Sequence, residues 1–71
     1  MSDEMSQRFL RMAQLRQITG LSKSTIYRLE ELGRFPARLK LTGRASAWRM
    51  GEVLRWMEAR PRANRQESRA A

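Results

Sequence analysis

Hydrophobic side chains recur at helical spacing near the start of the chain. The members of this first run are Phe9, Leu10, Met12, Leu15 and Ile18. Their spacing predicts an amphipathic helix. Gly20 follows the run, and glycine is the residue that most readily adopts the left-handed conformation just beyond a helix end. We therefore expect the first helix to end at Gly20.

The next helical pattern covers residues 22–32. Ser22 is a candidate N-cap, because its hydroxyl can accept a hydrogen bond from an amide two or three residues later. Gly33 ends the pattern, and the positions expected to face the core are Ile26, Leu29 and Leu32. Only the three residues 20–22 separate the two predicted helices. This spacing is typical of a helix-turn-helix.

Beyond Gly33 the pattern changes to a period of two. The apolar Ala37, Leu39 and Leu41 alternate with the basic Arg38 and Lys40. This alternation predicts a strand with one face on the core and a basic face in solvent. Residues 42–44 supply a turn, and residues 45–48 are expected to return as the second strand of a hairpin.

A third helix is predicted to start at Gly51 and to continue over residues 52–60, and Pro61 ends it because the residue before a proline avoids the helical region. Its apolar stripe consists of Val53, Leu54, Trp56 and Met57. We expect Trp48 and Trp56 to pack the hairpin and this helix onto the core. The predicted fold is thus mainly α with a small β-hairpin, a winged helix-turn-helix over residues 8–60. Residues 1–7 and the basic residues 61–71 are expected to be flexible.

Composition narrows the possible functions. The 71 residues include no cysteine and no histidine, and the seven acidic residues are scattered. Disulfides, thiolate metal sites and the commonest general base are therefore excluded, so we expect no enzyme, no metal and no cofactor. No apolar run is long enough to span a membrane, and no basic-then-apolar leader opens the chain. We expect a cytoplasmic protein with no membrane contact and no small-molecule ligand.

The charge points to a polyanionic partner. Lysine and arginine number 15, which gives a net charge of +8 and a pI near 11.7. Residues 8–60 hold 12 of these cations and 4 acidic residues, so the predicted domain carries the full excess. Such a balance favours nucleic acid as the partner.

On a helical wheel, one face of the second predicted helix lies opposite Ile26. This outer face consists of Lys23, Ser24, Tyr27, Arg28 and Glu31. Four of these five residues, all except Glu31, are hydrogen-bond donors. The N-terminal part of the second helix of a helix-turn-helix enters the major groove, so these four donors are expected to meet the DNA. Arg28 has the geometry for a bidentate pair with guanine. A merely solvated helix face would show the same composition, and this second interpretation stays open for the helix alone.

The predicted hairpin adds a second group of cations. Arg38 and Lys40 share one strand face, and Arg44 lies at the tip. Arginine at a wing tip exploits the negative potential of a narrow minor groove. The convergence of both elements favours DNA binding over a solvated surface. Arg8, Arg11 and Arg16, in or beside the first helix, either contact phosphates or only keep that helix soluble.

Several short segments resemble the AlpA family of phage and prophage DNA-binding regulators. The resemblance covers residues 8–60 and rests on TGLSKSTIYRL at 19–29, GRFP at 33–36, Lys40-Leu41, Gly43-Arg44, Trp48-Arg49, Val53 and Trp56. It implies a fold related to MerR-type and excisionase domains, and a regulator of a mobile element that in many relatives also promotes excision. The family's DNA contacts, carried to matching positions, fall on Ser22, Lys23, Ser24, Thr25, Tyr27, Arg28, Lys40 and Arg44. With Arg38 and Thr42 of the wing, these residues form the predicted interface.

The sequence leaves three functions open. The first is a transcriptional regulator that binds double-stranded DNA specifically, and the second is an excisionase that bends attachment-site DNA for an integrase. The third is a basic module that docks an acidic protein. Further partners left open are a second copy of the chain, as a dimer or a cooperative array on DNA, and RNA polymerase or the integrase.

Overall fold

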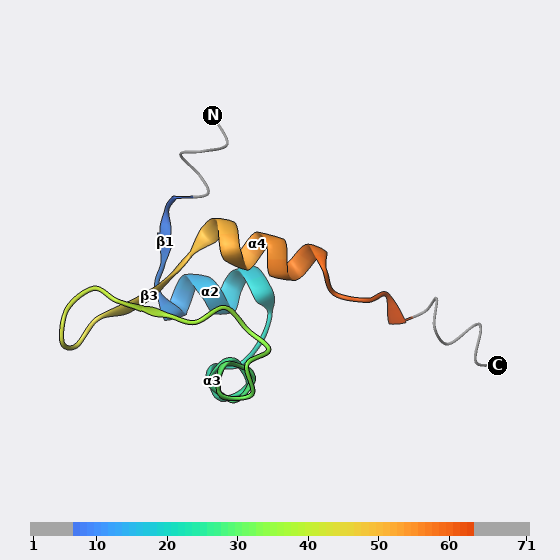
Figure 1. Cartoon of the computed structure of the whole chain (residues 1–71), viewed down its shortest axis with the longest axis horizontal. Coiled ribbons are helices and arrows are strands. Elements are labelled where there is room, and N and C mark those ends of the chain that lie inside the picture. Colours follow the sequence, from blue (N-terminus) through green and yellow to red (C-terminus); the bar gives the residue numbers. More distant parts are fainter. Residues whose placement is uncertain (1–6, 64–71) are drawn as a thin grey trace.

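The computed structural model describes residues 7–63. Of the two segments predicted to be flexible, 1–7 and 61–71, residues 1–6 and 64–71 lie outside this range. The described elements follow the order β1 (Phe9–Leu10), α2 (Met12–Thr19), α3 (Lys23–Glu31), β2 (Leu39–Lys40), β3 (Ser46–Arg49) and α4 (Met50–Glu58). In Figure 1, α3 is seen end-on below α2, α4 runs above α2, and the loop between β2 and β3 projects away from the helices. This arrangement is the predicted winged helix-turn-helix.

The turn between α2 and α3 is built as the sequence predicts. Gly20 has φ 76°, in the left-handed region, and its amide donates to the carbonyl of Arg16 at 2.8 Å. The hydroxyl of Ser22 caps α3 by accepting from the amide of Thr25 at 3.2 Å. At the other end of α3, Gly33 has φ 73°. Both glycines occupy a left-handed conformation that costs other residues free energy. Each glycine therefore favours the end of the helix that precedes it.

The strand β1 was not predicted. Phe9 and Leu10 continue the helical pattern in sequence, but they pair with β3 in the antiparallel register Phe9↔Arg49 and Leu10↔Trp48. The expectation that the first helix includes them is wrong. A two-residue strand has no local signal of its own, because its hydrogen bonds come from a partner about 40 residues away.

The wing, which we define as residues 37–49, contains β2, β3 and their turn. β2 pairs with β3 in the register Leu39↔Ala47, and the amide of Leu41 donates to Ala45 at 2.7 Å. The predicted core-facing side of the first strand is wrong, since Leu39 and Leu41 are 36% and 40% exposed and Ala37 is exposed as well. The strand order β1-β3-β2 places β3 in the centre of the sheet and leaves β2 at its edge, where its side chains stay outside the buried core cluster.

Two further core expectations fail at helix ends and edges. Leu32 is 58% exposed because α3 ends at Glu31, and Leu54 of α4 is 40% exposed. α4 itself begins at Met50, one residue before the predicted start at Gly51, and ends at Glu58, two residues before the predicted end. The amide of Met50 donates to the carbonyl of Arg8 at 2.9 Å. The segment beside β1 thus fixes the start of α4.

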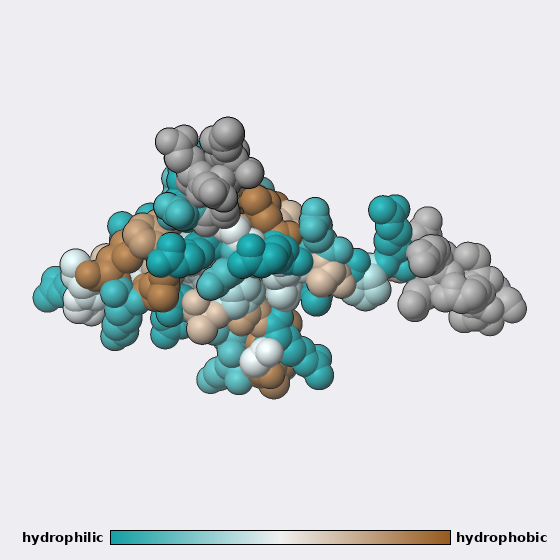
Figure 2. Space-filling model, turned by 45° about the horizontal axis from the view of Figure 1, so that its top comes forward, coloured by the Kyte–Doolittle hydropathy of each residue, from teal (hydrophilic) through white to brown (hydrophobic). Residues whose placement is uncertain are grey.

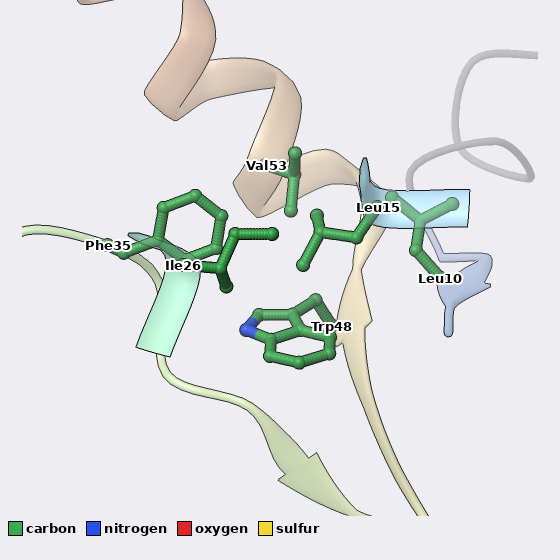
Figure 3. Packing of buried hydrophobic residues seen from close by; sticks show 6 residues of the cluster. All are labelled: Leu10, Leu15, Ile26, Phe35, Trp48 and Val53. Atoms are coloured by element: carbon green, nitrogen blue, oxygen red, sulfur yellow. The ribbon is translucent and has the colours of Figure 1, made fainter. Parts of the chain in front are cut away.

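The core joins every helix to the sheet. Its buried members point toward one another in Figure 3 and are Leu10, Leu15, Ile26, Phe35, Trp48 and Val53. Trp48 is 1% exposed, and Trp56 packs against the cluster with its ring edge-on to Phe35, the centroids 4.7 Å apart. The prediction that both tryptophans pack the wing and the third helix onto the core is confirmed. Ile26 anchors α3 here, so the opposite face of α3 is held outward.

Candidate nucleic-acid interface

The outer face of α3 presents the donors that the helical wheel places there. Lys23, Ser24, Tyr27 and Arg28 are exposed, whereas Ile26 on the other side is completely buried. Because Ile26 is fixed in the core, this face of α3 has one direction relative to the rest of the domain. The N-terminal turns of α3 therefore form a platform of hydrogen-bond donors, the exposed face that carries Lys23, Ser24, Tyr27 and Arg28.

Ser22 and Thr25 have a local role at the start of α3. The Ser22 hydroxyl donates to the Thr25 hydroxyl at 2.9 Å and accepts from the Thr25 amide at 3.2 Å. The Ser24 hydroxyl lies 3.4 Å from that of Ser22. These contacts order the first turn of the helix, so Ser22 and Thr25 support the platform while Lys23 and Ser24 lie on its open surface.

The tip of the wing is shaped by Thr42. Its hydroxyl accepts from the amides of Arg44 and Ala45, both at 3.2 Å. Such a side-chain-to-backbone turn fixes the local chain without apolar burial. Arg44 is exposed beyond this turn, and Lys40 is exposed on β2. Thr42 thus shapes the tip, and Lys40 and Arg44 supply its free cations.

Arg38 has an intramolecular partner that the sequence pattern did not reveal. Its guanidinium forms an ion pair with Glu30 and lies 5.2 Å from the centre of the Tyr27 ring. Its backbone amide donates to Glu30 at 2.7 Å. Glu30 has no sequence signal for this role, because the two residues come together only when the chain returns from α3 to the wing.

Two hollows run between α3 and its neighbours, and Tyr27 lines both. The first lies between α3 and the wing and is lined by Ser24, Tyr27, Arg28, Glu30, Glu31, Arg38 and Lys40. The second lies between α3, the wing and the start of α2 and is lined by Arg11, Met12, Ala13, Tyr27, Arg44, Ser46 and Trp48. Six of the ten predicted site residues therefore line these two hollows, on either side of Tyr27. The other four, Ser22, Lys23, Thr25 and Thr42, line neither of them. The second hollow adds Arg11, whose role the sequence leaves open, and Ser46, for which the sequence has no signal.

The surface chemistry of this region is mainly hydrophilic. Figure 2 shows hydrophilic side chains on both sides of α3, and apolar side chains exposed along the wing.

Within residues 7–63, no group of acidic, histidine or cysteine side chains has the arrangement of a metal site. None of the helices in the same range has the length and apolar character needed to cross a membrane.

The order of elements, the N-capped second helix and the basic wing together define a winged helix-turn-helix. Comparison with known families agrees with this class, since residues 8–61 match the family described as the prophage CP4-57 regulatory protein, AlpA. The chain belongs to the AlpA family, as the sequence motifs predict.

A phage relative supports the same assignment. The chain is 43% identical over 58 residues to the uncharacterized protein ORF88 of Enterobacteria phage P4. The aligned region covers 82% of this chain and 66% of that protein. The family match connects the chain with prophage regulatory proteins, and the relative connects it with a phage.

Proposed function

We propose that the protein is a sequence-specific, double-stranded-DNA-binding transcriptional regulator of a phage, prophage or integrative element. The observation that carries this proposal is the convergence of α3 and the wing. Arg28 of α3 and Lys40 of β2 line the same hollow, while Arg44 of the wing lines the next one, beside Tyr27. A helix for the major groove thus lies beside a cationic wing that can follow the backbone or the minor groove.

Each element has its own part in binding. Arg28 would pair with a guanine edge, Lys23 and Ser24 would contact base edges or phosphates, and Tyr27 would contact the backbone. Arg44 and Lys40 would bind backbone phosphates from the wing. Regulation would follow from occupancy and bending of DNA near a promoter, with no chemical step and no cofactor.

A gel-shift titration tests the proposal. The purified protein is titrated against promoter and attachment-region fragments of its own element, with excess nonspecific competitor and at two salt concentrations. Discrete shifts that resist the competitor support site-specific binding. Smearing that vanishes with competitor or salt would contradict it and would leave a basic module for an acidic protein partner as the better explanation.

A substitution on α3 makes this test specific. Arg28→Ala is expected to weaken binding to the specific fragment by about 1–3 kcal/mol, because a bidentate base contact is lost. Arg55→Ala is the control, since it removes the same charge from the exposed surface of α4. Equal effects of the two substitutions would mean that only net charge matters.

The same titration separates the regulator from an excisionase. An excisionase fills several adjacent attachment sites, so a ladder of cooperative shifts on attachment-region DNA would favour that second function. A single shift confined to promoter DNA favours the regulator. Both functions use the interface described above, so the choice depends on the DNA and on partners such as an integrase or RNA polymerase.

A further inference from the structure

Glu30, near the end of α3, holds the start of the wing at two points. One carboxylate oxygen accepts from the backbone amide of Arg38 at 2.7 Å, and the other pairs with the Arg38 guanidinium. The Glu30 side chain is only 14% exposed, against 40% for Arg38. The guanidinium also lies over the Tyr27 ring. Arg38 is thus fixed between two residues of α3, and β2 begins at the very next residue.

The connection from α3 to β2 is anchored at its other end by α4. The indole N–H of Trp56 donates to the carbonyl of Arg34 at 2.6 Å, and Phe35 packs on the Trp56 ring. Residues 34–38 are therefore held to α4 at their start and to α3 at their end. Within residues 7–63, the hydrogen bonds that join α3 to the wing are the two made by Glu30.

We propose that Glu30 is a positioning residue that sets the angle of the wing against the recognition helix through Arg38. The inference rests on the proposed function and deepens it, because it assigns Arg38 to the protein's own geometry and leaves four other cations to meet the DNA: Lys23, Arg28, Lys40 and Arg44. The packing of Arg38 on Tyr27 also fixes the ring that lies between the two hollows. An acidic residue is thereby required for DNA binding on a strongly basic surface.

This role predicts a result of opposite sign to simple electrostatics. If Glu30 only repels phosphate, Glu30→Ala raises the net charge by one, frees Arg38 and tightens binding. If Glu30 positions the wing, the same substitution weakens specific binding although the protein becomes more basic. Arg38 gives a second contrast. A guanidinium that is paired with Glu30, and not with a phosphate, releases no counterions from the DNA on binding, so its removal should leave the salt dependence of binding unchanged.

The experiment uses fluorescence anisotropy with the shortest fragment of the element's own DNA that the wild-type protein shifts in the presence of competitor. The variants are Glu30→Ala, Glu30→Gln, Arg38→Ala, the double variant Glu30→Ala/Arg38→Ala and the control Glu58→Ala. Glu58 is an acid of α4, outside the proposed interface, and its side chain is exposed. Each variant is titrated at several salt concentrations, and its folding is checked by far-UV circular dichroism.

We expect Glu30→Ala and Arg38→Ala each to weaken specific binding about tenfold, and the double variant to be no weaker than either, because contacting residues act as one unit. Glu30→Gln retains the acceptor for the Arg38 amide and is expected to lose about threefold, since it lacks the charge of the pair. Arg38→Ala should leave the salt slope unchanged, whereas loss of a phosphate contact lowers it by about one. Glu58→Ala should bind the DNA as tightly as wild type.

Three results would overturn the proposal. Tighter binding by Glu30→Ala would make Glu30 a simple repulsive charge, and a salt slope lowered by about one in Arg38→Ala would make Arg38 a phosphate contact. A wild-type protein that shifts no fragment would remove the proposed function as well. If Glu30→Ala fails to fold, the Glu30→Gln result decides, supported by amide exchange of Arg38, which is expected to speed up when its acceptor is weakened.

Discussion

Helices α2 and α3 and the outer part of the wing, residues 37–45, all carry large aliphatic side chains, but these side chains are buried to different extents. Leu15 and Ile26 are completely buried, whereas Leu39 and Leu41 are 36% and 40% exposed. The helix pair is held by a shared core, and residues 37–45 are held by the contacts between Glu30 and Arg38, by pairing with β3 and by the Thr42 turn. The element proposed to recognise bases is thus anchored by apolar burial, while the element proposed to follow the backbone is anchored mainly by hydrogen bonds.

The strongest test of this contrast is a substitution that leaves a cavity under α3. Ile26→Ala is expected to destabilise the protein by about 2–5 kcal/mol, because a completely buried side chain is removed. A core of this size stabilises a small domain by only about 3–5 kcal/mol, so the substitution should remove a large share of the free energy of unfolding. Urea denaturation followed by circular dichroism measures the loss. A cost below about 1 kcal/mol would mean that α3 is not anchored by the core.

The glycines of the two regions give a matched pair. Gly20→Ala is expected to cost about 1–2 kcal/mol, because Gly20 has a positive φ. A Cβ at Gly20 would meet nothing within 4 Å, so the cost is one of backbone conformation alone. Gly43→Ala, in the wing, has equally open space and no positive φ, and should be neutral or slightly stabilising. Thermal unfolding of both variants checks this, and equal costs would contradict the assigned role of the helix end.

At the wing tip we expect an effect on DNA affinity that is independent of sequence. Arg44→Ala should weaken specific and nonspecific duplexes alike and lower the salt slope by about one, because one phosphate contact is lost. Titrations of both duplexes at several salt concentrations measure the two quantities. A loss confined to the specific duplex would move base recognition from α3 to the wing.

The smallest effect on stability is expected at an exposed leucine of the wing. Leu41→Ser should change the free energy of unfolding by no more than about 0.5 kcal/mol, because Leu41 already contacts solvent. Chemical denaturation provides the measurement. A loss of 2 kcal/mol or more would show that the wing is packed in solution, and the contrast with the helix pair would disappear.

The helix-turn-helix was predictable because its signals are local. Gly20, Ser22 and Gly33 act within their own turns, and Ile26 repeats at the helical period. The period-two pattern of the wing correctly indicated a strand. It also predicted a buried face, which is wrong, because alternation records which side chains share a face and not whether another element covers that face.

The candidate site divides in the same way. Lys23, Ser24 and Arg28 were predicted from the wheel, and the structure exposes them. The partners that unite the site, Glu30 with Arg38 and Tyr27 with both hollows, join segments that are distant in the chain or lie on different elements. No spacing rule predicts such contacts.

The sequence by itself determined the family, the basic character, the two helices with their turn and the donors on the outer face of α3. Each of these depends on composition, on a motif or on interactions within one helical turn. Only the tertiary structure decided that Phe9 and Leu10 form a strand, that β2 lies at the edge of the sheet with exposed leucines and that Glu30 holds Arg38. These features depend on which segments meet after the chain has folded back on itself, and hydrogen bonds and burial between distant segments leave no periodic trace in the sequence.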